Sequence, residues 1–184
     1  MNSGPIRDYN KLNFPDPDFS TNDLASCVAS AAIINPPNLY YGFIADCGVA
    51  VISEDGKVQK TENQGPDKFE RKVWEKNYPG KTWRDKEAKR DYLSKYRNKP
   101  GEPMSFGVLN GEPKGEHYIT TGIFSLRKGD TVLVYSDGMA LALFDEAGNL
   151  KPRFRDVFSN DLNGLERLCR REATSEATLV YSRI

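Results

Sequence analysis

Two apolar segments, each ending in an aspartate, restrict the fold of this chain more than any other feature. Residues 40–45 precede Asp46, and residues 131–136 precede Asp137. β-branched and aromatic residues dominate both segments, which is typical of buried β-strands. A carboxylate at the end of such a strand is costly unless a partner compensates for it. The residues alone leave two interpretations open: turn-capping aspartates, or ligands of magnesium or manganese, which prefer oxygen donors.

The remaining pattern predicts an α+β domain. A small apolar stretch ends as a strand before residues 36–38, which form a turn. The strand region 39–52 is interrupted near Asp46, and the turn at residues 54–56 predicts a hairpin. Further strands are expected at 124–126, 131–135 and 177–184, and an amphipathic helix near 162–169.

We place this domain at residues 23–184, preceded by an N-terminal arm and interrupted by an insert. Residues 1–22 are polar and proline-containing, which predicts an irregular N-terminal arm. Lys, Arg, Glu and Asp dominate residues 67–100, which predicts a charged helical insert. A capping box from Thr82 to Asp85 precedes an apolar stripe in this insert. The stripe fits a solvated helix with one apolar edge, or a flap that contacts a substrate.

Composition argues against several classes of function. The chain has 184 residues with 26 basic and 26 acidic side chains, so its net charge is zero and no nucleic-acid partner is expected. No apolar run approaches the ~20 residues of a membrane span, so no membrane association is expected. The single His117 is read as a surface or turn histidine. The three thiols are widely spaced and expected to be mostly buried, which indicates a cytoplasmic protein without disulfides and without a zinc-binding Cys-x-x-Cys pair. They are Cys27, Cys47 and Cys169.

Several motifs resemble those of the protein phosphatase 2C family, the metal-dependent Ser/Thr phosphatases. Residues 121–138, TGIFSLRKGDTVLVYSDG, are similar to its late signature G-D-x-x-L-x-x-S-D-G, in which the Asp, here Asp137, binds metal. Residues 44–58 resemble the G-D-S-R strand and hairpin, whose Asp, here Asp46, helps hold an additional metal. Thr61 stands in the family's T-x-D-H stretch, and residues 175–180 resemble its final D-N-A-T-L-V strand.

The resemblance covers about residues 24–66 and 103–183, and the sequence departs from it at both ends. The R-x-x-N-E-D and D-G-x-G-G segments, which supply the family's first metal ligands, have no match. Ser175 replaces the final Asp, and Glu176 stands at the following Asn position. Glu176 reaches the metal only if the strand shifts by one residue, which turns a side chain to the other face.

The resemblance implies a phosphatase-2C-like α-β-β-α sandwich of two antiparallel sheets, N-terminally incomplete. It implies Mn²⁺ or Mg²⁺ at Asp137, Asp46, Gly138 and Glu176, with the two aspartates at neighbouring strand ends. The expected function is metal-dependent hydrolysis of phosphoserine or phosphothreonine on a phosphorylated protein substrate. Three explanations of the missing motifs stay open: the C-terminal part of a longer phosphatase, a non-catalytic domain that binds a protein partner, or a shortened active variant.

Overall fold

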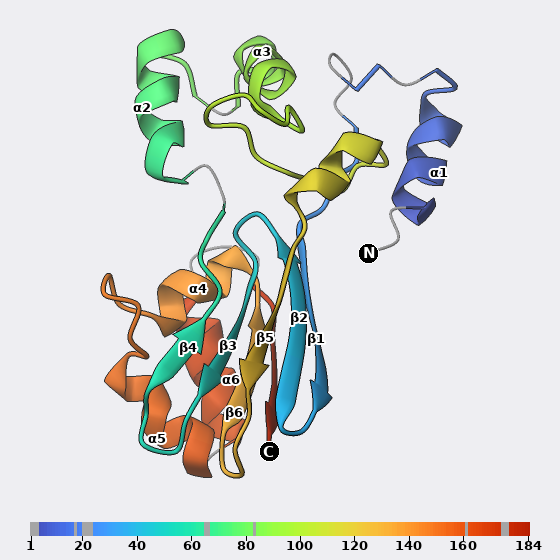
Figure 1. The fold of residues 1–184 in the computed structure, drawn as a ribbon. Coiled ribbons are helices and arrows are strands. Elements are labelled where there is room, and N and C mark those ends of the chain that lie inside the picture. The colour runs from blue at the N-terminus through green and yellow to red at the C-terminus, as the bar shows by residue number, and fades with distance from the viewer. Residues whose placement is uncertain are drawn as a thin grey trace. The chain divides into compact units, whose positions relative to one another are not determined.

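The computed structural model divides the chain into two compact units, which are Met1–Val28 with Gln64–Ile119, and Ala29–Asn63 with Thr120–Ile184. Figure 1 shows the order of their elements along the chain. The structure describes residues 4–16, 18–19, 24–64, 67–82, 84–160, 162–173 and 177–184.

Two antiparallel sheets form the centre of the second unit. One sheet has the order β1-β2-β5, and the other has the order β4-β3-β6-β7 (Figure 1). This confirms the predicted α+β fold with two antiparallel sheets. The strands are β1 (Ala29–Asn35), β2 (Asn38–Ile44), β3 (Gly48–Ile52), β4 (Val58–Lys60), β5 (Thr120–Ser125), β6 (Thr131–Tyr135) and β7 (Leu179–Arg183).

The inward faces of the two sheets share one apolar cluster. Leu39 and Phe124 of the first sheet pack with Val49 and Val132 of the second. The segment predicted as a single strand region, residues 39–52, therefore supplies one strand to each sheet. The chain crosses between the sheets through the turn that contains Asp46.

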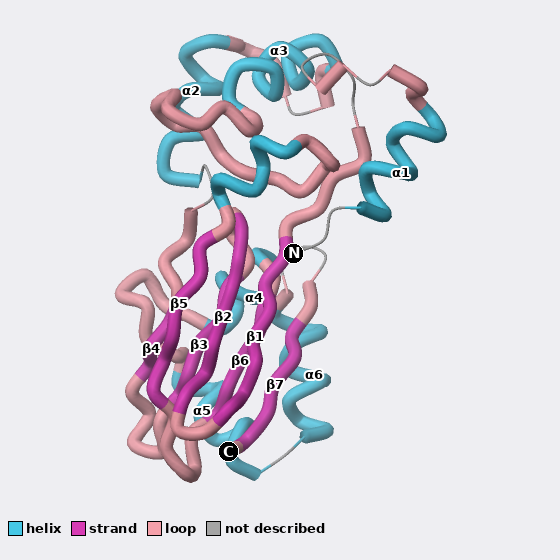
Figure 2. Tube along the Cα trace, turned by 45° about the vertical axis from the view of Figure 1, so that its right-hand side comes forward, coloured by secondary structure: helices cyan, strands magenta, loops and turns pink. Residues whose placement is uncertain are grey.

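Three helices cover the outward face of the four-stranded sheet, and Figure 2 shows them behind the strands. They bury a second cluster that includes Leu133 of β6, Leu143 and Phe154. The predicted helix near residues 162–169 is present, whereas the other two had no clear sequence pattern. The three helices are α4 (Asp137–Leu143), α5 (Pro152–Asn160) and α6 (Leu162–Glu172).

Short helices around an aromatic cluster form the first unit. Tyr92 of α3 and Val73 of α2 are buried with Phe106 and Val108. The predicted helical insert thus contains two helices, and the apolar stripe of its second helix faces a core. The elements are α1 (Gly4–Asn13), α2 (Asp67–Asn77), α3 (Lys86–Tyr96) and the 3₁₀ helix η1 (Pro113–Tyr118).

The N-terminal arm differs from the sequence prediction. Gly4–Asn13 forms the helix α1, where an irregular segment was expected. Pro5 is tolerated in the first turn, where its missing N–H has no intrahelical partner to lose. Asn10 is fully buried: its amide donates to the carbonyls of Ala25 and Asn110, at 2.9 Å each. These long-range bonds hold α1 in place, and the local polar composition gave no sign of them.

None of the helices among the described residues is long and apolar enough to cross a membrane.

Candidate functional site

The pairing of β3 with β6 brings the two strand-end aspartates to one edge of the sheet. Gly48 lies opposite Tyr135 in this antiparallel ladder. Asp46 is two residues before Gly48, and Asp137 is two residues after Tyr135. Because the two strands run in opposite directions, both aspartates leave the ladder at the same end. The register therefore agrees with the prediction that they occupy neighbouring strand ends.

Asp46 lies in a tight turn between the two sheets. Its neighbours Ala45 and Cys47 are buried, and Asp46 itself is half-buried. Ala45 has a φ of 63°, in the left-handed region that favours glycine. The phosphatase motif that this segment resembles has Gly at that position, and the left-handed turn gives a physical reason for it.

Asp137 is exposed and begins α4 directly after β6. The preceding Ser136 fixes this junction to the start of β7. Its N–H donates to the carbonyl of Thr178 at 3.0 Å, and its Oγ accepts from the N–H of Thr178 at 2.9 Å. Gly138 is buried in the first helical turn. Because glycine has no side chain, only its backbone oxygen could contact a cation. The β6–α4 junction thus holds Asp137 at the sheet edge with its side chain open to solvent.

The described residues form no complete set of metal ligands. They contain no group of three or more His, Cys, Asp or Glu side chains that could hold a metal ion. Glu176, the third carboxylate of the expected set, lies outside the described residues, as does Ser175. Magnesium is commonly held by one or two protein carboxylates together with waters and substrate phosphate. Asp46 and Asp137 fit such a weak site in the kind and number of donors, but not a complete two-metal centre.

A hydroxyl pair beside the aspartates was not predicted from the sequence. Thr61 accepts a hydrogen bond from the N–H of Val49 at 3.1 Å, and its own N–H donates to the Val49 carbonyl at 2.9 Å. The Thr61 and Tyr135 hydroxyl oxygens come together over Gly48, where a Cβ would lie 2.7 Å from the first and 2.5 Å from the second. Burial raises the pKa of Tyr135. The sequence pointed to Thr61 through its place in the T-x-D-H stretch. Nothing in that stretch indicates that Tyr135 is its partner.

The exposure of the histidine and of the thiols agrees with the sequence prediction only in part. His117 is exposed in η1, which agrees with a turn histidine. Cys27 is exposed, contrary to the expected burial, whereas Cys47 is buried and Cys169 half-buried. Desolvation of the sulfur raises the pKa of Cys169, and also that of Cys27, although the residue as a whole is exposed. A thiol with a raised pKa is protonated at neutral pH and is a poor nucleophile.

No protein-family model and no curated protein matches the chain. Solved structures do match it. The serine/threonine phosphatase PstP/Ppp of Mycobacterium tuberculosis is 16% identical, with a TM-score of 0.57, over 99% of this chain and 67% of that one. The catalytic domain of PstP in complex with two manganese ions is 16% identical, with a TM-score of 0.54, over 97% of this chain and 64% of that one.

A third structure, PppA, a key regulatory component of T6SS in Pseudomonas aeruginosa, is 11% identical, with a TM-score of 0.56. It is matched over 99% of this chain and 65% of its own length. The chain thus spans about two thirds of the structures that it resembles. Identities this low establish the fold alone. The chain has an incomplete fold of the protein phosphatase 2C type, as its motifs predicted.

Proposed function

We propose that the chain is the phosphatase-like part of a metal-dependent protein serine/threonine phosphatase. The observation that carries this proposal is the β3–β6 register, which brings Asp46 and Asp137 to one sheet edge. These are two of the four positions at which the family resemblance implies metal contacts. The fold likeness to Ser/Thr phosphatases supports the same conclusion.

Asp137 and Asp46 would hold Mn²⁺ or Mg²⁺, and Gly138 and Glu176 are proposed as further contacts. A bound divalent ion lowers the pKa of a coordinated water and stabilises charge on a transferring phosphoryl group. Asp137 is exposed, which leaves this edge open to a phosphate on a protein surface. The thiols need take no part, because such hydrolysis requires no cysteine nucleophile. We assign the substrate to phosphorylated proteins of the cytoplasm.

A second candidate function is a non-catalytic phosphatase-like domain that binds a protein partner. The observation that favours it is the incomplete donor set, with no cluster of three ligating side chains in the described ranges. Two carboxylates bind magnesium weakly because this ion loses its waters reluctantly. A domain with such a site can keep the phosphatase fold without turnover.

Manganese binding and turnover of p-nitrophenyl phosphate distinguish the two candidates. Titration calorimetry measures the manganese affinity of the folded wild type and of Asp137→Asn. Asp145→Asn is the matched control. Asp145→Asn removes the same charge from an exposed residue of the same unit. Asp145 lies in the turn after α4, where its carboxylate accepts a hydrogen bond from the Asn149 N–H. The phosphatase proposal predicts manganese binding that Asp137→Asn weakens at least tenfold and Asp145→Asn leaves unchanged.

Manganese-dependent turnover that follows the same order shows that this chain alone is sufficient for catalysis. Binding without turnover supports a phosphatase part that needs further ligands. A folded chain that binds no manganese contradicts the phosphatase proposal. Metal-independent binding of a phosphorylated peptide in that case supports the non-catalytic domain.

A further inference from the structure

The ladder of β3 and β6 ends on a buried pair of hydroxyls. Gly48 and Tyr135 are its last paired residues, beyond which the two chains diverge toward Asp46 and Asp137. We propose that the Tyr135–Thr61 hydroxyl pair is a positioning device that sets the separation of these two aspartates. This inference rests on the proposed function, because it concerns the same sheet edge.

Each hydroxyl is anchored to a different strand of the ladder. Thr61 follows β4 and is fixed to β3 by two hydrogen bonds with Val49, one to the backbone carbonyl at 2.9 Å and one from the backbone N–H at 3.1 Å. Tyr135 is the last residue of β6. The place where the two hydroxyls come together therefore links the start of β3 to the end of β6, which is where backbone pairing stops.

Gly48 makes this contact possible. A Cβ at Gly48 would lie 2.5 Å from the Tyr135 Oη and 2.7 Å from the Thr61 Oγ1. Any larger residue would therefore occupy the space in which the two hydroxyls meet. The tyrosine ring passes over a position without a side chain and also packs on Phe144, with ring centroids 5.4 Å apart. The ring is held between backbone and aromatic neighbours, so its hydroxyl has little freedom to move.

The pair acts on the aspartates through short lengths of chain. Tyr135 is two residues from Asp137, and Val49, to which Thr61 is bonded, is three residues from Asp46. The side chains of tyrosine and threonine end in hydroxyls, which carry no charge at physiological pH. The device therefore fixes geometry without adding a charge that would compete for a cation.

Three substitutions test this role, with one control. Tyr135→Phe and Thr61→Val each remove one hydroxyl and preserve shape, and Thr61→Ser keeps the hydroxyl. Tyr181→Phe is the control, because it removes a tyrosine hydroxyl from β7 of the same sheet, away from the ladder end. We expect Tyr135→Phe and Thr61→Val to weaken manganese binding about tenfold each, with the double variant no weaker than either. Thr61→Ser and Tyr181→Phe should bind as the wild type does.

If the wild type binds manganese and both Tyr135→Phe and Thr61→Val bind it with the same affinity, the positioning role is overturned. The proposed function is unaffected by that result. A wild type that binds no manganese overturns the proposed function, and amide hydrogen exchange then decides the positioning role without metal. Positioning predicts faster exchange at residues 45–48 and 136–138 in Tyr135→Phe and Thr61→Val, but not in Tyr181→Phe. Unchanged exchange, or faster exchange spread over the whole unit, contradicts it.

Discussion

Gly48 and Gly42 are both strand glycines of the second unit, yet their surroundings differ. A Cβ on Gly48 would overlap the Tyr135 and Thr61 hydroxyls, whereas a Cβ on Gly42 would find its nearest atoms at 3.6 and 3.8 Å. The first position requires glycine because two side chains cross it. The second accepts a methyl group at ordinary van der Waals distance.

We predict that Gly48→Ala lowers the free energy of unfolding by about 1–3 kcal/mol, because it forces the Tyr135 ring or the strand to move. Gly42→Ala should change it by about 0.5 kcal/mol or less. Urea unfolding followed by circular dichroism measures both variants. If both variants lose the same free energy of unfolding, the two hydroxyls beside Gly48 are not the reason that this position requires glycine.

Asn98 combines an unusual backbone conformation with complete burial in the first unit. Its φ is 52°, and its amide group accepts from the N–H of Val108 at 2.9 Å and donates to the Asn110 Oδ1 at 3.2 Å. Asparagine tolerates the left-handed region better than other residues with a Cβ, apart from aspartate. One residue therefore fits the left-handed turn and also pairs with the Val108 N–H and the Asn110 Oδ1.

Asn98→Ala should lower the stability of the fold by about 2–4 kcal/mol, because it leaves buried partners unsatisfied and keeps a Cβ in the left-handed region. Asn98→Gly relieves the backbone and should cost about 1 kcal/mol less than Asn98→Ala. The comparison requires only chemical denaturation of the two variants. An equal loss would assign the whole effect to the hydrogen bonds.

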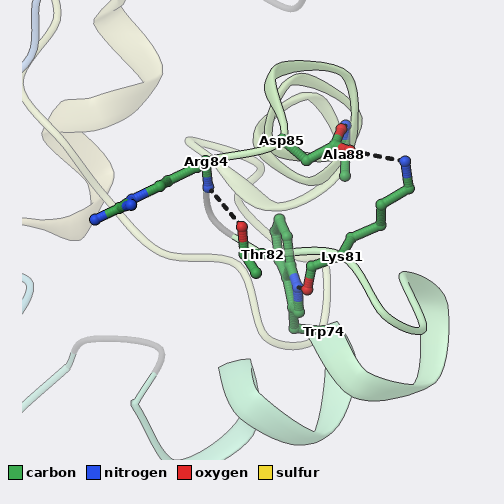
Figure 3. A network of polar contacts seen from close by, with 6 residues as sticks. All are labelled: Trp74, Lys81, Thr82, Arg84, Asp85 and Ala88. Atoms are coloured by element: carbon green, nitrogen blue, oxygen red, sulfur yellow. Dashed lines mark hydrogen bonds and ion pairs between the residues drawn. The ribbon is translucent and has the colours of Figure 1, made fainter.

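At the scale of elements, α3 begins three residues later than a Thr82 cap would allow. Asp85 is its N-cap and accepts from the N–H of Ala88 at 3.0 Å, while Thr82 accepts from the N–H of Arg84 at 3.4 Å in the preceding turn (Figure 3). The Lys81 ammonium donates to the other Asp85 oxygen at 2.7 Å. The predicted capping box therefore named the N-cap residue, Asp85, but assigned the capping role to Thr82, which lies in the turn before the helix.

This cap makes the stability of α3 depend on pH. The Lys81 ammonium, followed by the Ala88 N–H, lowers the pKa of Asp85 below its usual 3.8. A carboxyl whose folded pKa is depressed stabilises the fold above its unfolded pKa, and that stabilisation disappears as the pH falls through the folded value. We predict that Asp85→Asn, which still accepts from Ala88, lowers the melting temperature less than Asp85→Ala at pH 7.

The same two variants should lose less stability than the wild type between pH 5 and pH 2, because neither carries this carboxyl. Melting temperatures across that range provide the measurement. A wild type whose acid sensitivity matches that of Asp85→Asn would show that Asp85 contributes nothing to it.

At the scale of the molecule, the second unit exposes an apolar row on its three-stranded sheet. Ile33, Tyr40 and Ile123 are paired across β1, β2 and β5, and remain 69%, 40% and 57% exposed. The opposite face of the sandwich differs, since three helices cover the four-stranded sheet there. Adjacent exposed apolar residues of this kind promote association or dye binding.

The double variant Ile33→Thr/Ile123→Thr should bind less of a hydrophobic dye, while its melting temperature stays close to that of the wild type, because surface changes cost about 0.5 kcal/mol or less each. Leu39→Thr is the matched control, since Leu39 lies on the inward face of β2 and is fully buried. That change should cost about 2–5 kcal/mol. Unchanged dye binding in the double variant would place the apolar surface elsewhere.

The sequence by itself determined those features that depend on local pattern. The strand segments around Asp46 and Asp137, the hairpin after β3 and the apolar stripe of α3 follow from periodicity and turn residues that act over a few positions. The order of the phosphatase-like motifs predicted the fold and the two aspartates. The helix α4, only seven residues long, is too short to show a helical period and was not predicted.

The tertiary structure alone decided which strands share a sheet and which side chains meet. A turn at Ala45 sends β2 and β3 into different sheets, whereas the sequence showed only an interruption near Asp46. Asn10 donates a hydrogen bond to the carbonyl of Asn110, 100 positions away, and the hydroxyls of Tyr135 and Thr61 come together over Gly48. Such contacts depend on packing between segments far apart in the chain. A local pattern carries no information about them, because the partner of each buried polar group is set only when the whole unit closes.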